Sequence, residues 1–289
     1  MTAPVAVIGA GHMGGAMAGR LHRDGRAVLV YNRTRARAEK ITGATVAGSA
    51  REAAAAAEVI LVSLADDAAA RAVYSGPDGL VAGLWAGAVV VETSTLAPGT
   101  VRELADLVRS RGATLLDAPV SGSVPLVERG ELTFMIGGDR RAVEAVRPVL
   151  DVLGKRVFHL GAQGNGSIMK LAVNSALHGL NQALAEALVL AEKAGLDRSA
   201  AYEVFASSAL AAPFVQYKRA AYERPDEAAP AFTLDLVDKD LALIADLAAQ
   251  VGVPMRQLTA NRAVVRAALE AGLGDADMSA LAVLLRNDR

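Results

Sequence analysis

Short apolar runs rich in β-branched residues alternate with Ala-, Arg- and Glu-rich stretches along the first part of the chain. The short runs predict strands, and the stretches with helical periodicity predict helices. The predicted strands are Val5–Ile8, Val28–Tyr31, Val59–Leu64, Val89–Glu92, Thr114–Asp117, Leu132–Ile136 and Val157–Leu160. The predicted helices are Met13–Arg23, Arg35–Ile41, Ser49–Ala57, Thr100–Arg111 and Arg140–Leu153. This alternation predicts an α/β domain with a mainly parallel, doubly wound sheet and helices on both faces.

The pattern changes after Gly161, where the sequence contains no further convincing strand. Long helical stretches follow at Ser167–Ala194, Leu234–Val251 and Pro254–Ala271. A chain of 289 residues is long for one compact core, which also favours two domains. We therefore predict an α/β domain over residues 1–162 and an all-helical domain over residues 163–289.

Composition and charge narrow the class of protein. The 30 basic and 31 acidic residues nearly cancel, so we expect neither a nucleic-acid partner nor a membrane partner. The chain has no cysteine, which excludes disulfides and thiolate chemistry, and we expect no metal site. The longest apolar stretch, Leu171–Leu190, is interrupted by Asn174, His178, Asn181 and Glu186. We expect a soluble, cytoplasmic protein.

A glycine-rich run, Gly9-Ala10-Gly11-His12-Met13-Gly14, follows the first predicted strand and opens a helix. Gly9 permits a tight turn, Gly11 lets a diphosphate approach the backbone, and Gly14 lets the helix pack on the sheet. A helix N-terminus supplies N–H donors for phosphate. The alternative is a purely structural turn, but the strand before and the helix after favour a Rossmann-type dinucleotide site. We expect cofactor contacts from Gly9, Gly11, His12, Met13 and Gly14.

The end of the second predicted strand distinguishes the two nicotinamide cofactors. NAD sites usually place a carboxylate there to bind the ribose hydroxyls. This chain has Asn32, Arg33 and Thr34 instead, and a guanidinium is suited to pairing with a 2′-phosphate and stacking on adenine. We therefore predict NADP(H) in preference to NAD(H), bound by these three residues. A solvated basic helix start is the alternative, and it suits Arg35 and Arg37 better than Arg33.

Gly166, Lys170 and Asn174 are spaced by four residues and share one face of the first helix of the second domain. Lys170, buried beside a cofactor, would serve as the proton donor or acceptor that carbonyl reduction requires, with Asn174 orienting it or binding the reacting oxygen. Alternatively, Lys170 extends to the surface and Asn174 satisfies backbone groups. His178 continues the same face, and we expect it to be a satisfied core histidine.

A third candidate is the turn after the strand Thr114–Asp117, where ligands of such sheets usually bind. Ser121, Gly122 and Ser123 offer hydroxyls and accessible backbone N–H groups for a substrate carboxylate. Taken alone, the segment fits an ordinary loop better than a binding turn.

Together these motifs resemble the β-hydroxyacid dehydrogenase family, which includes 3-hydroxyisobutyrate dehydrogenases and succinic semialdehyde and glyoxylate reductases. The resemblance spans nearly the whole chain. It rests on the glycine-rich run, on Asp117-Ala118-Pro119-Val120-Ser121-Gly122, on Gly166-x-x-x-Lys170-x-x-x-Asn174, and on Phe232-x-Leu234 followed by Lys239-Asp240-Leu241. Ser123 stands where the family often has glycine, and Val173 where it often has asparagine.

The resemblance implies that Lys170 is the catalytic acid and base, assisted by Asn174. It implies carboxylate binding by Ser121, Gly122 and Ser123, and further cofactor contacts from Leu64, Ala65 and Thr95. Phe232 and Lys239 would close the site from the helical domain and contact the cofactor. It also implies a homodimer or homotetramer assembled through that domain.

The predicted function is an NADP-dependent oxidoreductase that interconverts a small hydroxy acid and its semialdehyde or keto form. An imine reductase-like enzyme is one alternative, against which Lys170 and the Asp117–Gly122 run argue, since such enzymes usually lack the lysine. A non-catalytic NADP-binding regulator is another, and it has no need of Lys170, Asn174 and Ser121 together.

Overall fold

A computed structural model describes residues 4–287 of the chain. The chain separates into two compact units, Met1–Lys170 and Leu171–Arg289. This division falls shortly after the predicted domain boundary at residue 162. Each unit has its own hydrophobic core, and each is described by itself below.

The first unit is built on a six-stranded parallel sheet with the order β3-β2-β1-β4-β5-β6. The strands are β1 (Val5–Ile8), β2 (Val28–Tyr31), β3 (Thr45–Val46), β4 (Val59–Val62), β5 (Val89–Glu92) and β6 (Thr114–Asp117). The order reverses between β1 and β4, which is the point where doubly wound sheets bind their ligands. The predicted Rossmann-type sheet is confirmed, and only β3 was not foreseen.

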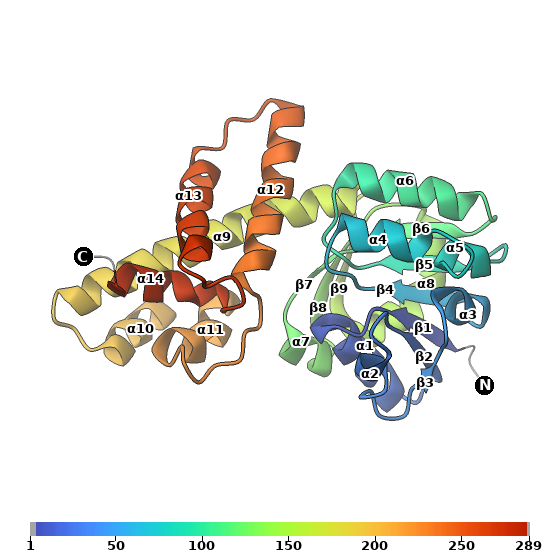
Figure 1. Cartoon of the computed structure of the whole chain (residues 1–289), viewed down its shortest axis with the longest axis horizontal. Coiled ribbons are helices and arrows are strands. Elements are labelled where there is room, and N and C mark those ends of the chain that lie inside the picture. The colour runs from blue at the N-terminus through green and yellow to red at the C-terminus, as the bar shows by residue number, and fades with distance from the viewer. Residues whose placement is uncertain (1–3, 288–289) are drawn as a thin grey trace. The chain divides into compact units, whose positions relative to one another are not determined.

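Helices cover both faces of this sheet because the side chains of each strand alternate between two apolar clusters (Figure 1). In β1, Val5 and Val7 join one cluster, whereas Ala6 and Ile8 join the other. The first cluster contains residues of α1 (His12–Arg23), α2 (Arg35–Ala38), α7 (Val124–Arg129) and α8 (Arg140–Leu153). The second contains residues of α3 (Ala50–Ala55), α4 (Asp67–Tyr74), α5 (Leu80–Gly83) and α6 (Pro98–Arg109).

A separate three-stranded sheet follows β6, with the order β7-β8-β9. Its strands are β7 (Val120–Ser121), β8 (Leu132–Ile136) and β9 (Gly154–His159). The β7–β8 pair is antiparallel and the β8–β9 pair is parallel. The sequence predicted β8 and β9 as strands, but strand propensity does not specify pairing partners, and the split into two sheets was not foreseen.

The carboxyl of Asp117, at the end of β6, is fully buried and holds the first turn of α9 (Asn165–Lys193). Oδ1 accepts hydrogen bonds from the backbone N–H of Gly164 and from Gln163 Nε2, both at 3.0 Å, and Oδ2 accepts one from Ser167 N at 3.0 Å. Burial raises the pKa of Asp117, and the backbone hydrogen bonds oppose that rise. Asp117 thus caps a helix that begins 48 residues later in the chain (165 − 117).

Hydrogen bonds connect two loops at the carboxyl edge of the main sheet, the loop after β4 and the loop after β5. Glu92, 1% exposed, accepts hydrogen bonds from Tyr74 Oη at 2.8 Å and from Ser94 N at 2.9 Å. Ser94 Oγ in turn accepts the N–H of Leu64 at 2.7 Å, and so joins the loop after β5 to the loop after β4. Burial raises the pKa of Glu92 to about 7, although the hydrogen bonds from Ser94 and Tyr74 act in the opposite direction.

The second unit is helical. It contains most of α9 together with α10 (Arg198–Ser207), α11 (Pro213–Glu223), α12 (Leu234–Val251), α13 (Arg256–Glu270), a short 3₁₀ turn (Met278–Ala280) and α14 (Leu281–Asn287). In Figure 1, α12 and α13 lie side by side, joined through Gly252, whose φ of 71° ends α12. As predicted, no strand occurs among the described residues after Leu171. No described helix is long and apolar enough to cross a membrane.

We expect Asp117→Ala to lower the free energy of unfolding by about 3 kcal/mol, because three donors lose a buried acceptor. Chemical denaturation in urea measures the change. Asp106→Ala removes an exposed carboxylate paired with Arg109 on α6, and it should cost less than about 0.5 kcal/mol. Equal effects of the two variants would contradict the capping role of Asp117.

Glu92→Gln should remove a pH dependence of stability. The folded-state pKa of Glu92 is raised to about 7 from a usual value of 4.5, so the unfolded chain releases this proton first. The wild type should therefore lose stability relative to the variant as pH rises from about 5 through about 7, by about 1.4 kcal/mol per pH unit at most. Urea denaturation at several pH values measures the difference. Glu58→Gln, at an exposed glutamate just before β4, should follow the wild type.

Candidate active site

The glycine-rich loop has the geometry expected of a diphosphate site. Gly9 has a φ of 99°, and a Cβ there would lie 2.1 Å from the carbonyl oxygen of Ser63. A Cβ on Gly14 would lie 2.0 Å from the carbonyl oxygen of Gly9. Gly11, by contrast, has no atom within 4 Å of its Cβ position, so the backbone before α1 is open to a ligand. Gly9 and Gly14 are thus required by packing, whereas a side chain at Gly11 would meet no protein atom. His12, exposed, and Met13, half-buried, open α1 beside this space.

Asn32, at the end of β2, helps to shape the same loop. Its Oδ1 accepts the N–H of Ala10 at 2.9 Å, and its Nδ2 donates to the carbonyl oxygen of Thr34 at 2.9 Å. Asn32 therefore connects the glycine-rich loop to the turn after β2. Arg33 and Thr34 on that turn are exposed. Arg35 is paired with Glu39 at 2.8 Å, whereas Arg33 has no ion pair within residues 4–287.

The loop after β4 contacts the glycine-rich loop directly. A Cβ on Gly9 would lie 3.2 Å from Leu64 Cδ2, so Leu64 packs beside the tightest turn of the loop. Ala65 is exposed next to it, and Thr95 follows Ser94 on the neighbouring loop. The structure therefore brings Leu64 and Ala65 to the glycine-rich loop at the sheet's topological switch point, and Ser94 connects the loop of Thr95 to them.

The Ser121–Ser123 turn lies where β7 leads into α7. Ser121 pairs with Thr133 in β8, and Ser123 precedes the first residue of α7. Gly122 has a φ of 143°, and a Cβ there would lie 2.7 Å from Leu132 Cδ2. The φ value therefore favours glycine at this turn, and a Cβ would also displace the end of the Leu132 side chain.

Lys170 lies on the second turn of α9 and is half-buried. Asp117 fixes the first turn of this helix, and Asp117 and Ser121 belong to the same short segment, at the end of β6 and in β7. Gly166, in the first turn of α9, has no room for a side chain, since a Cβ would lie 2.4 Å from the carbonyl oxygen of Met135. The backbone that bears Lys170 is therefore anchored to the segment that bears Ser121.

Asn174, in the second unit, is buried and bound to Asp240 of α12. Its Nδ2 donates to Asp240 Oδ2 at 2.6 Å, while its Oδ1 has no hydrogen-bond partner within the described residues. Asp240 is fully buried, and Lys239 Nζ lies 2.9 Å from its Oδ1. Burial raises the pKa of Asp240, but the nearby His178 ring and Lys239 ammonium outweigh burial, and the pKa lies below its usual value. An ionised Asp240 accepts only, which fixes the orientation of the Asn174 amide.

His178 and Phe232 lie beside this group. His178 is 3% exposed, and its ring centroid lies 6.1 Å from that of Phe232. Its Nε2 is 3.7 Å from Asp240 Oδ2, which is longer than a hydrogen bond. The expectation of a satisfied core histidine is therefore only half correct: the ring is buried, but among residues 4–287 neither ring nitrogen has a hydrogen-bond partner.

Three buried carboxylates that organise these elements were not assigned roles from the sequence. Glu92 ends a run of three valines, which is a signal for a buried acid at the end of a strand. Asp117 and Asp240 stood inside the recognised motifs, but their partners are distant in the chain and no local pattern identifies them. The described residues contain no cluster of three or more potential metal ligands.

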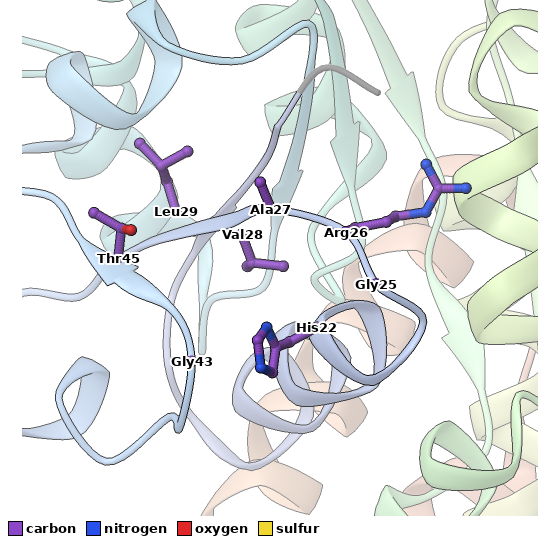
Figure 2. A pocket seen from close by; sticks show the side chains of 8 residues that line it. All are labelled: His22, Gly25, Arg26, Ala27, Val28, Leu29, Gly43 and Thr45. Carbon is purple, nitrogen blue, oxygen red and sulfur yellow. The ribbon is translucent and has the colours of Figure 1, made fainter. Parts of the chain in front are cut away.

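A surface hollow lies elsewhere, around the loop that leads into β2 (Figure 2). It is lined by His22, Gly25, Arg26, Ala27, Val28, Leu29, Gly43 and Thr45. It opens at the amino end of β2, opposite the edge where the glycine-rich loop lies. Arg26 donates from Nη2 to the carbonyl oxygen of Pro148 at 2.6 Å, so its guanidinium is already engaged. The hollow includes none of the predicted site residues.

Comparison with known proteins gives matches over almost the whole chain. A family model described as the NAD binding domain of 6-phosphogluconate dehydrogenase matches residues 4–161. A second model, described as "NAD-binding of NADP-dependent 3-hydroxyisobutyrate dehydrogenase", matches residues 164–285.

Individual relatives are similar over most of their lengths. The chain is 32% identical over 280 residues to 2-(hydroxymethyl)glutarate dehydrogenase of Eubacterium barkeri, covering 96% of this chain and 93% of the relative. It is 33% identical to glyoxylate/succinic semialdehyde reductase 2, chloroplastic, of Arabidopsis thaliana, covering 99% of this chain and 80% of the relative. The solved structure of Mycobacterium tuberculosis 3-hydroxyisobutyrate dehydrogenase with L-serine matches with a TM-score of 0.84 at 30% identity, covering 99% of this chain and 100% of that one.

These matches agree with the parallel sheet, the glycine-rich loop at its switch point and the helical second unit. The chain belongs to the family of 3-hydroxyisobutyrate dehydrogenases and glyoxylate and succinic semialdehyde reductases, the NAD(P)-dependent β-hydroxyacid dehydrogenases.

Proposed function

We propose that this oxidoreductase uses NADP(H) to interconvert a small β-hydroxy acid, or a related hydroxy acid, with its semialdehyde or keto form, and that Lys170 is the general acid and base. The observation that carries the proposal is the anchoring of α9. Asp117 holds the first turn of the helix that bears Lys170, and the same segment continues into Ser121 and Gly122. A proton donor and a carboxylate-binding turn are thus supported by one rigid element.

The bound nicotinamide supplies or accepts the hydride. Lys170 Nζ donates a proton to the oxygen of the substrate carbonyl as it becomes a hydroxyl, and takes that proton back in the reverse direction. Asn174 Oδ1 is an acceptor, because Asp240 holds the Nδ2 side of the amide, and it suits a hydroxyl donor. Asp240 is therefore a positioning residue for Asn174.

The substrate carboxylate binds at the Ser121–Gly122–Ser123 turn. The hydroxyls and the backbone N–H groups there are hydrogen-bond donors, which a carboxylate requires. The turn is held at one end by the pairing of Ser121 with Thr133 of β8. Binding the carboxylate at a fixed turn restricts the substrate to a small acid whose reacting carbon lies a short distance away.

The preference for NADP(H) rests on the turn after β2. Tyr31 ends the strand, and the next three residues are an amide, a guanidinium and a hydroxyl, with no carboxylate to repel a 2′-phosphate. Arg33 is exposed and unpaired within the described residues, so it is available to a phosphate. Gly9, Gly11, His12, Met13 and Gly14 form the diphosphate site, and Leu64, Ala65 and Thr95 line the neighbouring loops.

Assembly and location complete the proposal. Large apolar side chains are exposed on or near the second half of α9 and on α10, with Leu190 72%, Leu196 61% and Val204 67% exposed. Such surface supports a homodimer or homotetramer assembled through the helical unit.

Phe232 and Lys239 are proposed to close the site from that unit. We propose a cytoplasmic location on the near-neutral charge and the absence of cysteine.

Lys170→Ala should keep NADPH affinity and lose turnover by about 10²–10⁴-fold, because the proton donor is removed while the cofactor contacts remain. Turnover is followed by the absorbance of the reduced nicotinamide with glyoxylate, succinic semialdehyde and related semialdehydes. Lys193→Ala, at the other end of α9, is the matched control and should turn over normally. If the wild type reduces cyclic imines alone, the imine reductase alternative is favoured. If the wild type binds NADPH tightly but turns over none of these substrates, the regulator is favoured.

Arg33→Ala should lower kcat/KM for NADPH by about 10–100-fold, the effect of losing one charge-assisted contact, and should leave NADH little changed. The readout is the ratio of the two kcat/KM values with one saturating substrate. Arg37→Ala, a nearby exposed arginine on α2, should leave the ratio as it is in the wild type. A ratio unaffected by Arg33→Ala would contradict its assignment to the 2′-phosphate.

A further inference from the structure

Glu92 is a buried carboxyl group that the proposed proton transfer does not use. It ends β5 at the carboxyl edge of the main sheet and is 1% exposed. Its Oε1 accepts the N–H of Ser94 at 2.9 Å, and its Oε2 accepts the hydroxyl of Tyr74 at 2.8 Å. A buried acid with both oxygens engaged fixes the groups that donate to it, and those groups belong to the loop after β5 and to α4.

Ser94 connects this carboxyl to the loop after β4 and, through it, to the glycine-rich loop. Ser94 Oγ accepts the N–H of Leu64 at 2.7 Å. A Cβ on Gly9 would lie 3.2 Å from Leu64 Cδ2 and 2.1 Å from the carbonyl oxygen of Ser63, so the two loops are in close contact. Two hydrogen bonds and one packing contact therefore lead from Glu92 to the turn of the proposed diphosphate site.

The same carboxyl fixes one side of the segment that bears Thr95. The residue before Thr95 donates to Glu92, and two residues after it the N–H of Ala97 donates to Asp67 Oδ1 at 3.0 Å. Asp67 and Tyr74 are the first and last residues of α4. The half-buried Thr95 thus lies on a short segment that is held on both sides by carboxylates, one in β5 and one in α4.

The ionised form of Glu92 suits these partners, and the neutral acid does not. A carboxylate only accepts, whereas a protonated carboxyl also carries an O–H donor. A proton on Oε1 would break the hydrogen bond from Ser94 N, and a proton on Oε2 would oblige the Tyr74 hydroxyl to reverse. Protonation therefore disrupts at least one of the contacts that fix the loops.

Both forms are populated near neutral pH. Burial raises the pKa of Glu92 to about 7, the hydrogen bonds from Ser94 and Tyr74 oppose the rise, and the negative charge of Asp67 on α4 adds to it. On the other side, Asp117 is its neighbour in the register of β5 and β6, and on β4 its neighbour is the uncharged Val62.

We propose that Glu92 is a positioning residue for the cofactor: its ionised carboxylate, acting through Ser94, holds the loops of Leu64 and Thr95 in the arrangement that binds NADP(H), and its protonation releases them. This inference rests on the proposed cofactor contacts of these loops and adds a control of their affinity by pH. Because ionisation of Glu92 and cofactor binding favour each other, each strengthens the other by the same factor.

The experiment measures the Kd of NADPH and of NADH without substrate, by the fluorescence of the reduced nicotinamide, from about pH 5.5 to about pH 8. As pH falls through about 7, the wild-type Kd for both cofactors should rise by at least about fivefold more than that of Glu92→Gln, which does not titrate. The 2′-phosphate of NADPH itself titrates near a pH of about 6, and NADH lacks that group. Glu58→Gln, at an exposed glutamate, should follow the wild type.

Ser94→Ala keeps the Glu92 carboxyl and removes the hydroxyl that joins it to Leu64. The Kd of NADPH at about pH 8 should rise by about 3–10-fold, the effect of one lost buried hydrogen bond, and should increase less on acidification than that of the wild type. Urea denaturation at each pH shows whether each variant is folded under the conditions of the binding measurement.

The same pH profile in the wild type and in Glu92→Gln would overturn the role of Glu92 and leave the proposed function intact. A Kd that falls on acidification in the wild type alone would overturn it as well, because it would show direct repulsion between the carboxylate and the cofactor phosphates. Wild-type affinity and pH dependence in Ser94→Ala would show that the loops are not held through Ser94. A folded wild type that binds neither NADPH nor NADH at any pH would overturn both this inference and the proposed function.

Discussion

The interaction on which the arrangement of the first unit depends is the capping of α9 by Asp117. A carboxylate at the carboxyl end of β6 accepts two backbone N–H groups and one side-chain amide from the segment that starts the helix. The first turn of a helix has unsatisfied donors, and a buried helix start without such an acceptor would be costly. Because Asp117 precedes Ser121 by four residues and caps the helix bearing Lys170, one interaction fixes the backbone of two proposed functional positions. The glycines packed on Asp117 follow from the same constraint: a Cβ on Gly137 would lie 2.5 Å from its Oδ1.

Buried carboxylates organise the second unit in the same way. Asp277 accepts both contacts of the buried Lys218 ammonium, at 2.7 and 2.6 Å, and also the N–H groups of Ala231 and Ser279. Lys218 holds the pKa of Asp277 below its usual value although burial acts in the opposite direction. The segment that ends in Phe232 is thereby fixed at its backbone. Asp240 likewise fixes the side-chain amide of Asn174 by accepting a hydrogen bond from its Nδ2. A buried ion is costly, and breaking one of these pairs would leave a charge uncompensated, so each pair enforces one arrangement of the elements it joins.

The sequence predicted the elements well and their long-range contacts poorly. The strands of the main sheet have clear apolar runs, and the glycine-rich run identifies the loop because only glycine tolerates the φ of Gly9 and the contact at Gly14. The two-residue strands β3 and β7 carry too few residues for a period-two signal, and the second sheet depends on pairing that propensity does not encode. The roles of Glu92, Asp117 and Asp240 depend on partners 18 to 66 residues away in the chain, as for Tyr74 with Glu92 and Asn174 with Asp240. Local patterns contain no information about such contacts. The sequence alone therefore does not show that the buried His178 ring lies 3.7 Å from Asp240, beyond hydrogen-bond distance.

The distribution of the proposed roles follows from the physics of the two units. Diphosphate binding needs a helix N-terminus and a glycine turn at a sheet edge, so the proposed diphosphate contacts lie in the first unit and their geometry is set by backbone. Discrimination among small acids needs side chains that differ by single polar atoms, and a helix presents such side chains at regular intervals without altering the backbone. Asn174 and His178 are one turn apart on α9, so their side chains share one face of a helix whose start is fixed by Asp117. The proposed cofactor site thus depends on backbone geometry at Gly9 and Gly14, whereas the proposed proton transfer depends on side chains of a helix whose first turn is fixed.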